Sequence, residues 1–140
     1  MNEQENIALV KKLYEAFARG DLQTILDHVT EDVQLSNPGP STVPYFGDRT
    51  GPEQVREFFD ILVSTQENVN LTMDQFIAQG EAVATLGRFT GHVKATGKSF
   101  DSPVGHFFTI RNGKMARWIG LGDTANIAAA YSPAAAAASR

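Results

Sequence analysis

One histidine stands in otherwise apolar surroundings and could act on a small molecule. His106 lies in the segment PVGHFFTI, where strand alternation places it on the same face as Val104 and Phe108. Desolvation favours the neutral form of such a histidine, which could then exchange a proton near neutral pH. The same residue could instead be a core histidine whose ring is hydrogen-bonded to a neighbouring group.

Asp123 is the second residue that could carry acid/base chemistry. It follows the apolar strand end Trp118-Ile119-Gly120-Leu121-Gly122. A partly dry pocket would raise the pKa of its carboxyl and make it a general base. However, the sequence DTANIAAA also suits an aspartate that caps the N-terminus of a last helix.

Tyr14 and Asn37 are candidates for orienting a substrate. Tyr14 lies on the apolar stripe of the first expected helix, so its hydroxyl could donate into a pocket or satisfy a backbone group. Asn37 precedes Pro38 and could donate to a substrate oxygen, although Asn-Pro also begins turns.

Apolar side chains would form the walls of such a pocket, and aromatic residues on strands also serve as ordinary core. Tyr45 and Phe46 differ because they lie in a long Pro/Gly-rich segment, so burying them requires this loop to fold over a pocket entrance. The expected wall residues are Trp118, Phe89, Phe108, Val104, Tyr45 and Phe46.

Composition excludes several other kinds of site. With no cysteine among the 140 residues, a disulfide framework, a thiolate zinc site and a cysteine nucleophile are excluded. The three histidines are far apart, without paired metal-ligand spacing, and no glycine-rich phosphate loop is present, so we expect neither a metal nor a cofactor.

Charge and hydropathy bound the partners and the location. The net charge of -4, without a Lys/Arg cluster, argues against nucleic acid and anionic membranes. No apolar run approaches the ~20 residues of a membrane span, and the N-terminus does not resemble a signal peptide. We therefore expect a cytoplasmic protein with neither nucleic acid nor a membrane as its partner.

Helical periodicity dominates the first half of the chain. A capping box of Asn2 and Glu5 begins a helix that Gly20 ends, and Asp21 caps a shorter helix reaching Val29. A strand at 33–36 runs into an irregular loop at 37–49. A second capping box, Thr50 and Glu53, begins a third amphipathic helix whose apolar stripe is Val55, Phe58, Phe59, Leu62 and Val63.

Alternating patterns dominate the second half. Strands are expected at 69–78, 82–95, 99–111 and 114–121, followed by a helical segment from Asp123 to Tyr131. Asn112-Gly113 is the strongest hairpin signal. Helices followed by hairpin-linked strands predict an α+β fold, with three N-terminal helices packed on a curved antiparallel sheet around a concavity. We expect one domain over 1–131 and a disordered, dispensable Ala-rich tail over 132–140.

Several segments resemble the NTF2-like superfamily, especially its SnoaL-like polyketide cyclases and ketosteroid-isomerase-related proteins. They are LYEAFARGDLQTILDHVTEDVQL, GDRTGPEQVREFF and TGKSFDSPVGHFFTIRNGKMARWIGLGDTANIAAA. The resemblance implies a cystatin-like cone with a ligand pocket. It also implies a homodimer through the outer sheet face, where Phe107, Ile119 and Leu121 would lie if His106 points inward.

The resemblance also implies roles for the polar residues. His106 stands where ketosteroid isomerases place an oxyanion acid, Tyr14 lies one residue from their tyrosine, and Asp123 matches the acid/base carboxylate of SnoaL-like cyclases. Asn37 replaces the carboxylate base of the isomerases, so steroid isomerisation by that mechanism is not expected. NTF2-like epoxide hydrolases keep Arg and Asp two apart on one strand, and Arg88 and Asp101 lack this spacing.

Two functions from different classes follow. The first is a cofactor-independent isomerase or cyclase acting on a small apolar carbonyl compound, with His106 and Asp123 as the acid/base pair and Tyr14 and Asn37 orienting the substrate. The second is a non-catalytic binding or accessory module. The first demands that His106, Asp123 and Tyr14 converge on one cavity, with His106 paired opposite Ile119. An Asp123 used only as a helix cap would favour the second.

Overall fold

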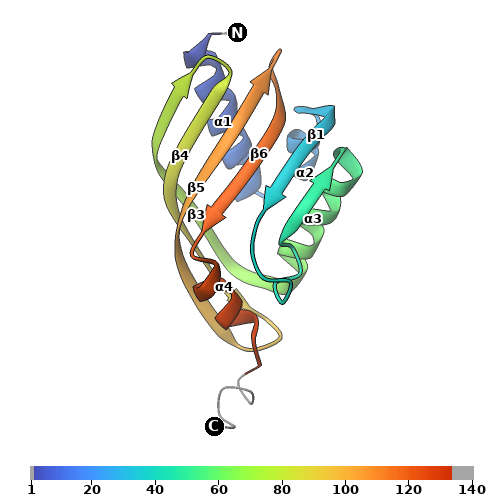
Figure 1. Cartoon of the computed structure of the whole chain (residues 1–140), viewed down its shortest axis with the longest axis vertical. Helices are drawn as coiled ribbons and strands as arrows, with labels where there is room; N and C mark the ends of the chain where they lie inside the picture. Colours follow the sequence, from blue (N-terminus) through green and yellow to red (C-terminus); the bar gives the residue numbers. More distant parts are fainter. Residues whose placement is uncertain (1, 134–140) are drawn as a thin grey trace.

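The computed structural model describes residues 2–133, so most of the Ala-rich tail lies outside the described residues. Four helices and six strands form the expected α+β architecture (Figure 1). In chain order the elements are α1 (Glu3–Ala18), α2 (Leu22–Leu26), β1 (Val29–Asn37), β2 (Gly47–Thr50), α3 (Pro52–Thr65), β3 (Gln66–Gln79), β4 (Ala82–Val93), β5 (Lys98–Arg111), β6 (Lys114–Gly122) and α4 (Thr124–Tyr131).

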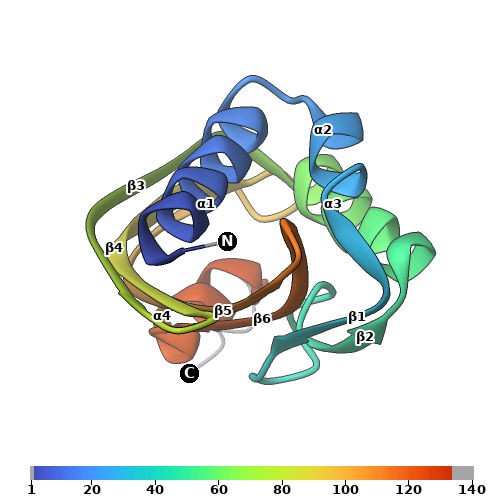
Figure 2. The ribbon, with the colours of Figure 1, turned by 90° about the horizontal axis from the view of Figure 1, so that it is seen from above.

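All six strands belong to one curved sheet with the order β2-β1-β6-β5-β4-β3. Seen from above, the arc of β3 to β6 wraps around α1, while α2 and α3 lie on the side of β1 and β2 (Figure 2). The sheet is not wholly antiparallel as expected, because β1 runs parallel to β6. This parallel pair joins the N-terminal half of the chain to its last strand.

The strands extend beyond the ranges expected from sequence. Val29 begins β1 instead of ending the second helix, and β3 begins at Gln66. The segment at 37–49 is also not wholly irregular, because its end forms β2, which pairs with β1 from Asn37–Gly47 to Gln34–Thr50. The backbone groups of β2 are therefore satisfied by hydrogen bonds to β1, a pairing that the local sequence of this segment does not predict.

Helix capping follows the sequence at three of four sites, one of which is Asp123 at the start of α4. Asn2 and Glu5 form the expected capping box, and Asp21 accepts from the Thr24 backbone N–H. The Thr50–Glu53 capping box is wrong, because Thr50 ends β2 and Gly51, at φ +86°, is the N-cap of α3. A positive φ at this turn favours glycine, which has no Cβ.

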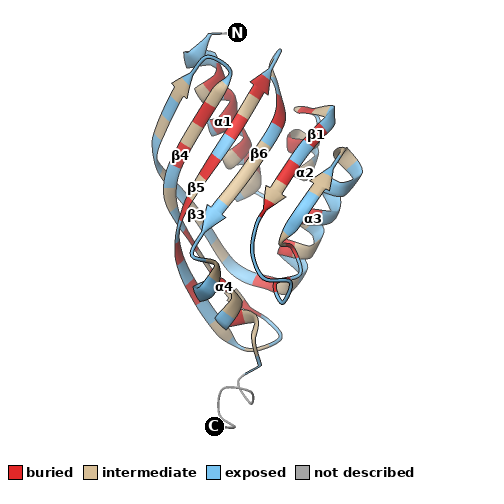
Figure 3. Cartoon of the chain, viewed as in Figure 1, coloured by how far each residue is buried: buried red, intermediate tan, exposed pale blue. Residues whose placement is uncertain are grey.

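Burial alternates along the strands of the curved sheet (Figure 3). In β5 every second residue from Phe100 to Ile110 is buried, including His106. The inner face therefore carries the core, and helices α1 and α3 cover it. Val63 departs from the expected helical stripe, since it is 56% exposed. Within residues 2–133, none of the helices combines the length and apolar character that a membrane crossing requires.

The outer face of the sheet carries an apolar patch. Ile77, Ala84, Phe107 and Ile119 form one row across β3 to β6 through successive pairings, and Leu86, Gly105 and Leu121 form the next row. Phe107, Leu86 and Leu121 are 40%, 51% and 55% exposed. We name these two rows the outer patch. Monomeric proteins rarely leave a contiguous patch of this kind in water.

We expect two copies of the chain to pair through the outer patch. Replacing both Phe107 and Leu121 with lysine should place like charges in the contact and give the 15.2 kDa monomer in sedimentation at micromolar concentration. The matched control is Val63→Lys, an exposed apolar residue on α3, which should leave the dimer intact. A wild-type chain that sediments as a monomer would contradict the expectation.

Candidate functional site

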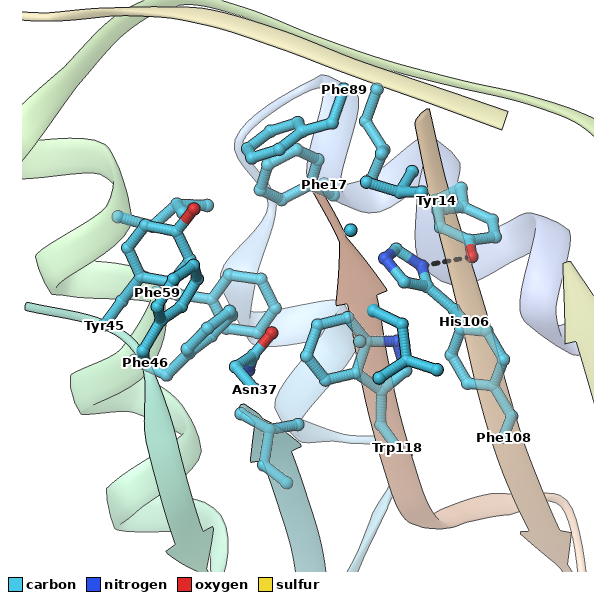
Figure 4. Close-up of a pocket in the computed structure, with 18 of the residues that line it drawn as sticks. Tyr14, Phe17, Asn37, Tyr45, Phe46, Phe59, Phe89, His106, Phe108 and Trp118 are labelled. Carbon is cyan, nitrogen blue, oxygen red and sulfur yellow. Dashed lines mark hydrogen bonds between the residues drawn. The ribbon is translucent and has the colours of Figure 1, made fainter. Parts of the chain in front are cut away.

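A cavity of about 110 Å³ lies between α1 and the concave face of the sheet. Its size is comparable with the roughly 150 Å³ apolar cavity that admits benzene in another protein. Aromatic side chains dominate its lining (Figure 4). The loop between β1 and β2 contributes Tyr45 and Phe46, whose rings meet edge to face at 5.0 Å. Since α3 adds Phe58 and Phe59 beside them, this side of the cavity is apolar.

The structure places nearly all of the expected site residues in the lining. These are Tyr14, Asn37, Tyr45, Phe46, Phe89, Val104, His106, Phe108 and Trp118. Asp123 is missing from the lining, which contains neither aspartate nor glutamate among the described residues. The cavity is therefore apolar with a few neutral polar groups.

A hydrogen-bonded chain crosses the cavity wall from β4 through α1 to β5. The Tyr14 hydroxyl lies 2.8 Å from Thr85 Oγ1 and 2.7 Å from His106 Nδ1. Figure 4 shows this bond to His106, with the second ring nitrogen of His106 turned toward the cavity. Thr85, Tyr14 and His106 thus form one unit, which we call the wall triad.

Burial sets the electrostatics of the wall triad. Desolvation lowers the pKa of His106 to about 3, so its imidazole is neutral over the physiological range. Desolvation also raises the pKa of Tyr14 far above its ordinary value, against a smaller lowering from the Thr85 hydrogen bond. All three groups are therefore neutral at pH 7. They act as hydrogen-bonding groups, and His106 is a weak general base.

The buried His106 should make the stability fall at mildly acid pH. Its folded pKa of about 3 lies below its unfolded value of 6.5. Both states are unprotonated above pH 6.5, and only the unfolded state binds a proton between these values. Stability should therefore decline as pH falls from 6.5, by at most about 1.4 kcal/mol per pH unit. Chemical denaturation at pH 7.0 and 5.0 measures this decline. In the variant His106→Gln, most of the difference in stability between the two pH values should be absent.

Asn37 ends β1 next to Gly120 of β6. It is only 6% exposed, and its Nδ2 is buried without a hydrogen-bond partner in the described structure. A Cβ added at Gly120 would stand 2.7 Å from Asn37 Oδ1 and 2.7 Å from the Trp118 ring. The carboxamide therefore lies over a position where any larger residue would collide with it.

Asp123 does not join His106 and Tyr14, so the expected three-residue convergence is wrong. Its side chain accepts from the Asn126 backbone N–H at 3.1 Å as the N-cap of α4, and its backbone N–H donates to Ser102 Oγ at 2.8 Å. The residue is exposed. Capping satisfies a backbone donor at the helix end, and it holds the carboxylate there, outside the cavity lining.

The register about the Asn112-Gly113 turn also differs from the expected one. The pairing shifts by one residue at Ala116 of β6, between the pairs Ile110–Met115 and Thr109–Arg117. His106 therefore pairs with Gly120 instead of Ile119. A β-bulge of this kind adds one residue to one strand, and no hairpin signal in the sequence reveals it.

The expected site residues did not include the lining residues Phe58 and Phe59, nor two neighbours of His106. Thr85 pairs with His106 across β4 and β5, and Gly120 pairs with it across β5 and β6. Thr85 lies two residues after the apolar Val83, so strand alternation places both side chains on the inner face. This pattern could have identified Thr85 from the sequence. Among residues 2–133, no three His, Asp or Glu side chains are placed together to hold a metal ion.

A helix-backed curved sheet around one apolar cavity places the chain in the NTF2-like, or cystatin-like, class of α+β proteins. The model of the SnoaL-like domain matches residues 10–118, and the chain belongs to this family. The α+β cone expected from sequence is therefore confirmed.

Solved structures of similar proteins agree with this family. An NTF2-like protein from Burkholderia xenovorans LB400 has 29% identity and a TM-score of 0.85, covering 94% of this chain and 99% of its own. An NTF2-like protein of unknown function from Burkholderia pseudomallei K96243 has 27% identity and a TM-score of 0.85, with the same coverage. TerC, co-crystallised with polyporic acid, has 23% identity and a TM-score of 0.82, covering 91% and 98%. No functionally curated protein shows significant similarity to the chain.

Proposed function

We propose that the chain binds a small, largely apolar molecule in the cavity beneath α1. The observation that carries this proposal is the cavity itself, about 110 Å³ with walls of aromatic and aliphatic side chains. Cavities of this composition with a few convergent polar groups are the usual sites for small ligands. TerC shares the fold only, and its co-crystal with polyporic acid supports the idea that such a fold can accommodate a small molecule.

Binding is favoured over proton transfer because the cavity lacks a competent base. No carboxylate lines it among the described residues, and Asp123 caps α4 outside it. The remaining titratable candidate is His106, whose pKa of about 3 makes it a poor proton acceptor. Among the described residues, the cavity therefore lacks the acid/base pair that an isomerase or cyclase of the expected kind requires.

A cyclase or isomerase reaction is the second candidate, and the wall triad favours it. A neutral His106 that Tyr14 holds in place could stabilise a negative charge developing on a substrate oxygen. Such a reaction needs a substrate that ionises without a protein base. Conversion of the ligand is what distinguishes this candidate from binding alone.

Titration calorimetry with single-ring aromatic compounds tests the binding proposal. We expect binding, and a higher melting temperature, since a ligand at 100 times its Kd adds about 2.7 kcal/mol of stability. Val104→Phe, which inserts a ring into the lining, should abolish binding while the protein stays folded. Mass spectrometry should recover the ligand unchanged; a new product would favour the second candidate. Absence of binding by every compound of this size would refute the proposal.

A further inference from the structure

Two polar side chains flank one glycine on the inner face of the sheet. His106 of β5 pairs with Gly120 of β6, and Ser36–Ile119 is the neighbouring pair of β1 and β6. Asn37, one residue after Ser36, therefore lies beside Gly120 on the other side. Both His106 and Asn37 are more than nine-tenths buried, at 8% and 6% exposure. We call Asn37, Gly120 and His106 the polar row.

The wall triad determines which atom His106 presents to the cavity. If the Thr85 hydroxyl donates to Tyr14 and the Tyr14 hydroxyl donates to His106 Nδ1, every hydroxyl hydrogen has an acceptor. The reverse direction leaves the buried Thr85 hydroxyl hydrogen without an acceptor among the described residues. Thr85 does not line the cavity, whereas the second ring nitrogen of His106 faces it, so only the first direction leaves its unpaired hydrogen where a ligand can accept it. The first direction is therefore preferred. The neutral ring then carries its proton on Nε2, which is a donor facing the cavity.

Asn37 presents an acceptor from the opposite side of the polar row. Figure 4 shows its carboxamide oxygen directed into the cavity. The same oxygen lies next to the space above Gly120, where a Cβ would be only 2.7 Å away. Gly120 has no side chain, and the Asn37 oxygen and the Trp118 ring cover its Cα closely, so a ligand meets the N–H donor and the C=O acceptor from the cavity. The row therefore combines one donor and one acceptor within an apolar cavity.

We infer that the polar row binds a single hydroxyl group on a planar ring, a phenol or a ring enol. Its oxygen accepts from His106 Nε2–H, and its hydrogen donates to Asn37 Oδ1. A ketone would use only the donor and would leave Asn37 Oδ1 facing an apolar ligand atom, which is unfavourable. The surrounding aromatic walls accommodate the ring. This inference rests on the proposed binding function and specifies its ligand class.

Phenol and toluene provide a matched pair of probes, because they differ only in the hydroxyl or methyl group on one ring. Calorimetry should show that the wild-type chain binds phenol at least as tightly as toluene, although toluene is more apolar. Asn37→Leu replaces the acceptor with an apolar side chain of similar size. We expect this variant to shift the ratio of the two Kd values at least tenfold toward toluene, and its melting curve shows that it is folded.

The outcomes separate this inference from the binding proposal. If neither compound binds the wild-type chain, the proposed function fails for ligands of this size. If toluene binds and the Kd ratio is unchanged in Asn37→Leu, only the inference is overturned. Nitrogen-15 chemical shifts of His106 in the free wild-type protein show directly which ring nitrogen carries the proton, without any ligand or substitution. They should show the proton on Nε2; a proton on Nδ1 would overturn the inference.

Discussion

Replacing Tyr14 with phenylalanine should lower the free energy of unfolding by about 1–3 kcal/mol, because it leaves two buried groups without a partner. The lost hydroxyl bonds Thr85 Oγ1 at 2.8 Å and His106 Nδ1 at 2.7 Å. Without it, His106 is free to take either neutral tautomer. Phenol binding should weaken as well, while toluene binding should change little. Urea denaturation and calorimetry measure the two effects.

Tyr45→Phe is the matched control for this substitution. Tyr45 is also a buried tyrosine in the cavity lining, but its hydroxyl makes no hydrogen bond of good geometry in the described structure, and burial dominates its pKa, on which Gln66 has only a minor effect. The nearby Gln66 amide nitrogen donates instead to the Tyr131 hydroxyl at 2.8 Å. Removing the Tyr45 hydroxyl should therefore leave stability unchanged or raise it. Equal destabilisation by both substitutions would show that the wall triad has no special role.

Gly120→Ala should reduce the affinity for phenol at least tenfold and destabilise the protein by about 1–3 kcal/mol, the usual range for overpacking. The new Cβ would stand 2.7 Å from both Asn37 Oδ1 and the Trp118 ring, so it would displace the acceptor and a wall residue of the cavity. Both neighbours must move for the methyl group to fit. Calorimetry with phenol and thermal unfolding measure the two consequences.

Gly105→Ala provides the control on the neighbouring strand. Gly105 lies on the outer face of β5, and a Cβ there would meet only the Thr85 backbone oxygen at 3.5 Å, an ordinary contact. This substitution should leave phenol affinity within twofold of wild type. Similar losses in both variants would mean that adding a methyl group to any glycine of these strands disturbs the sheet, and that Gly120 has no specific role in phenol binding.

Periodicity and turn chemistry are local, and they predicted the elements well. The helical spacing after Asn2 and the turn at Asn112-Gly113 place α1 and the β5–β6 hairpin correctly, because each depends on residues close in sequence. The parallel contact of β1 with β6 and the strand β2 were missed. These depend on which distant strand supplies hydrogen-bond partners, and no local pattern specifies that choice.

The same distinction holds for the candidate site. Alternation places His106 and Phe108 on the inner face, because side-chain direction in a strand follows from position alone. Asp123 could either act as a base in a pocket or cap the last helix, and the sequence did not distinguish these two roles. The shift at Ala116 moved the partner of His106 from Ile119 to Gly120, and one extra residue in a strand has no reliable local signal.

The parallel pairing of β1 with β6 also bears on the order in which the molecule folds. Strands β3 to β6 follow one another along the chain and pair as neighbours, so they can form before the rest. Contact between β1 and β6 joins residues such as Ser36 and Ile119, which are far apart in the chain. Closing so long a loop is entropically slow. Asn37 therefore reaches Gly120 late, and we expect a refolding chain to become able to bind its ligand only after most of its secondary structure has formed.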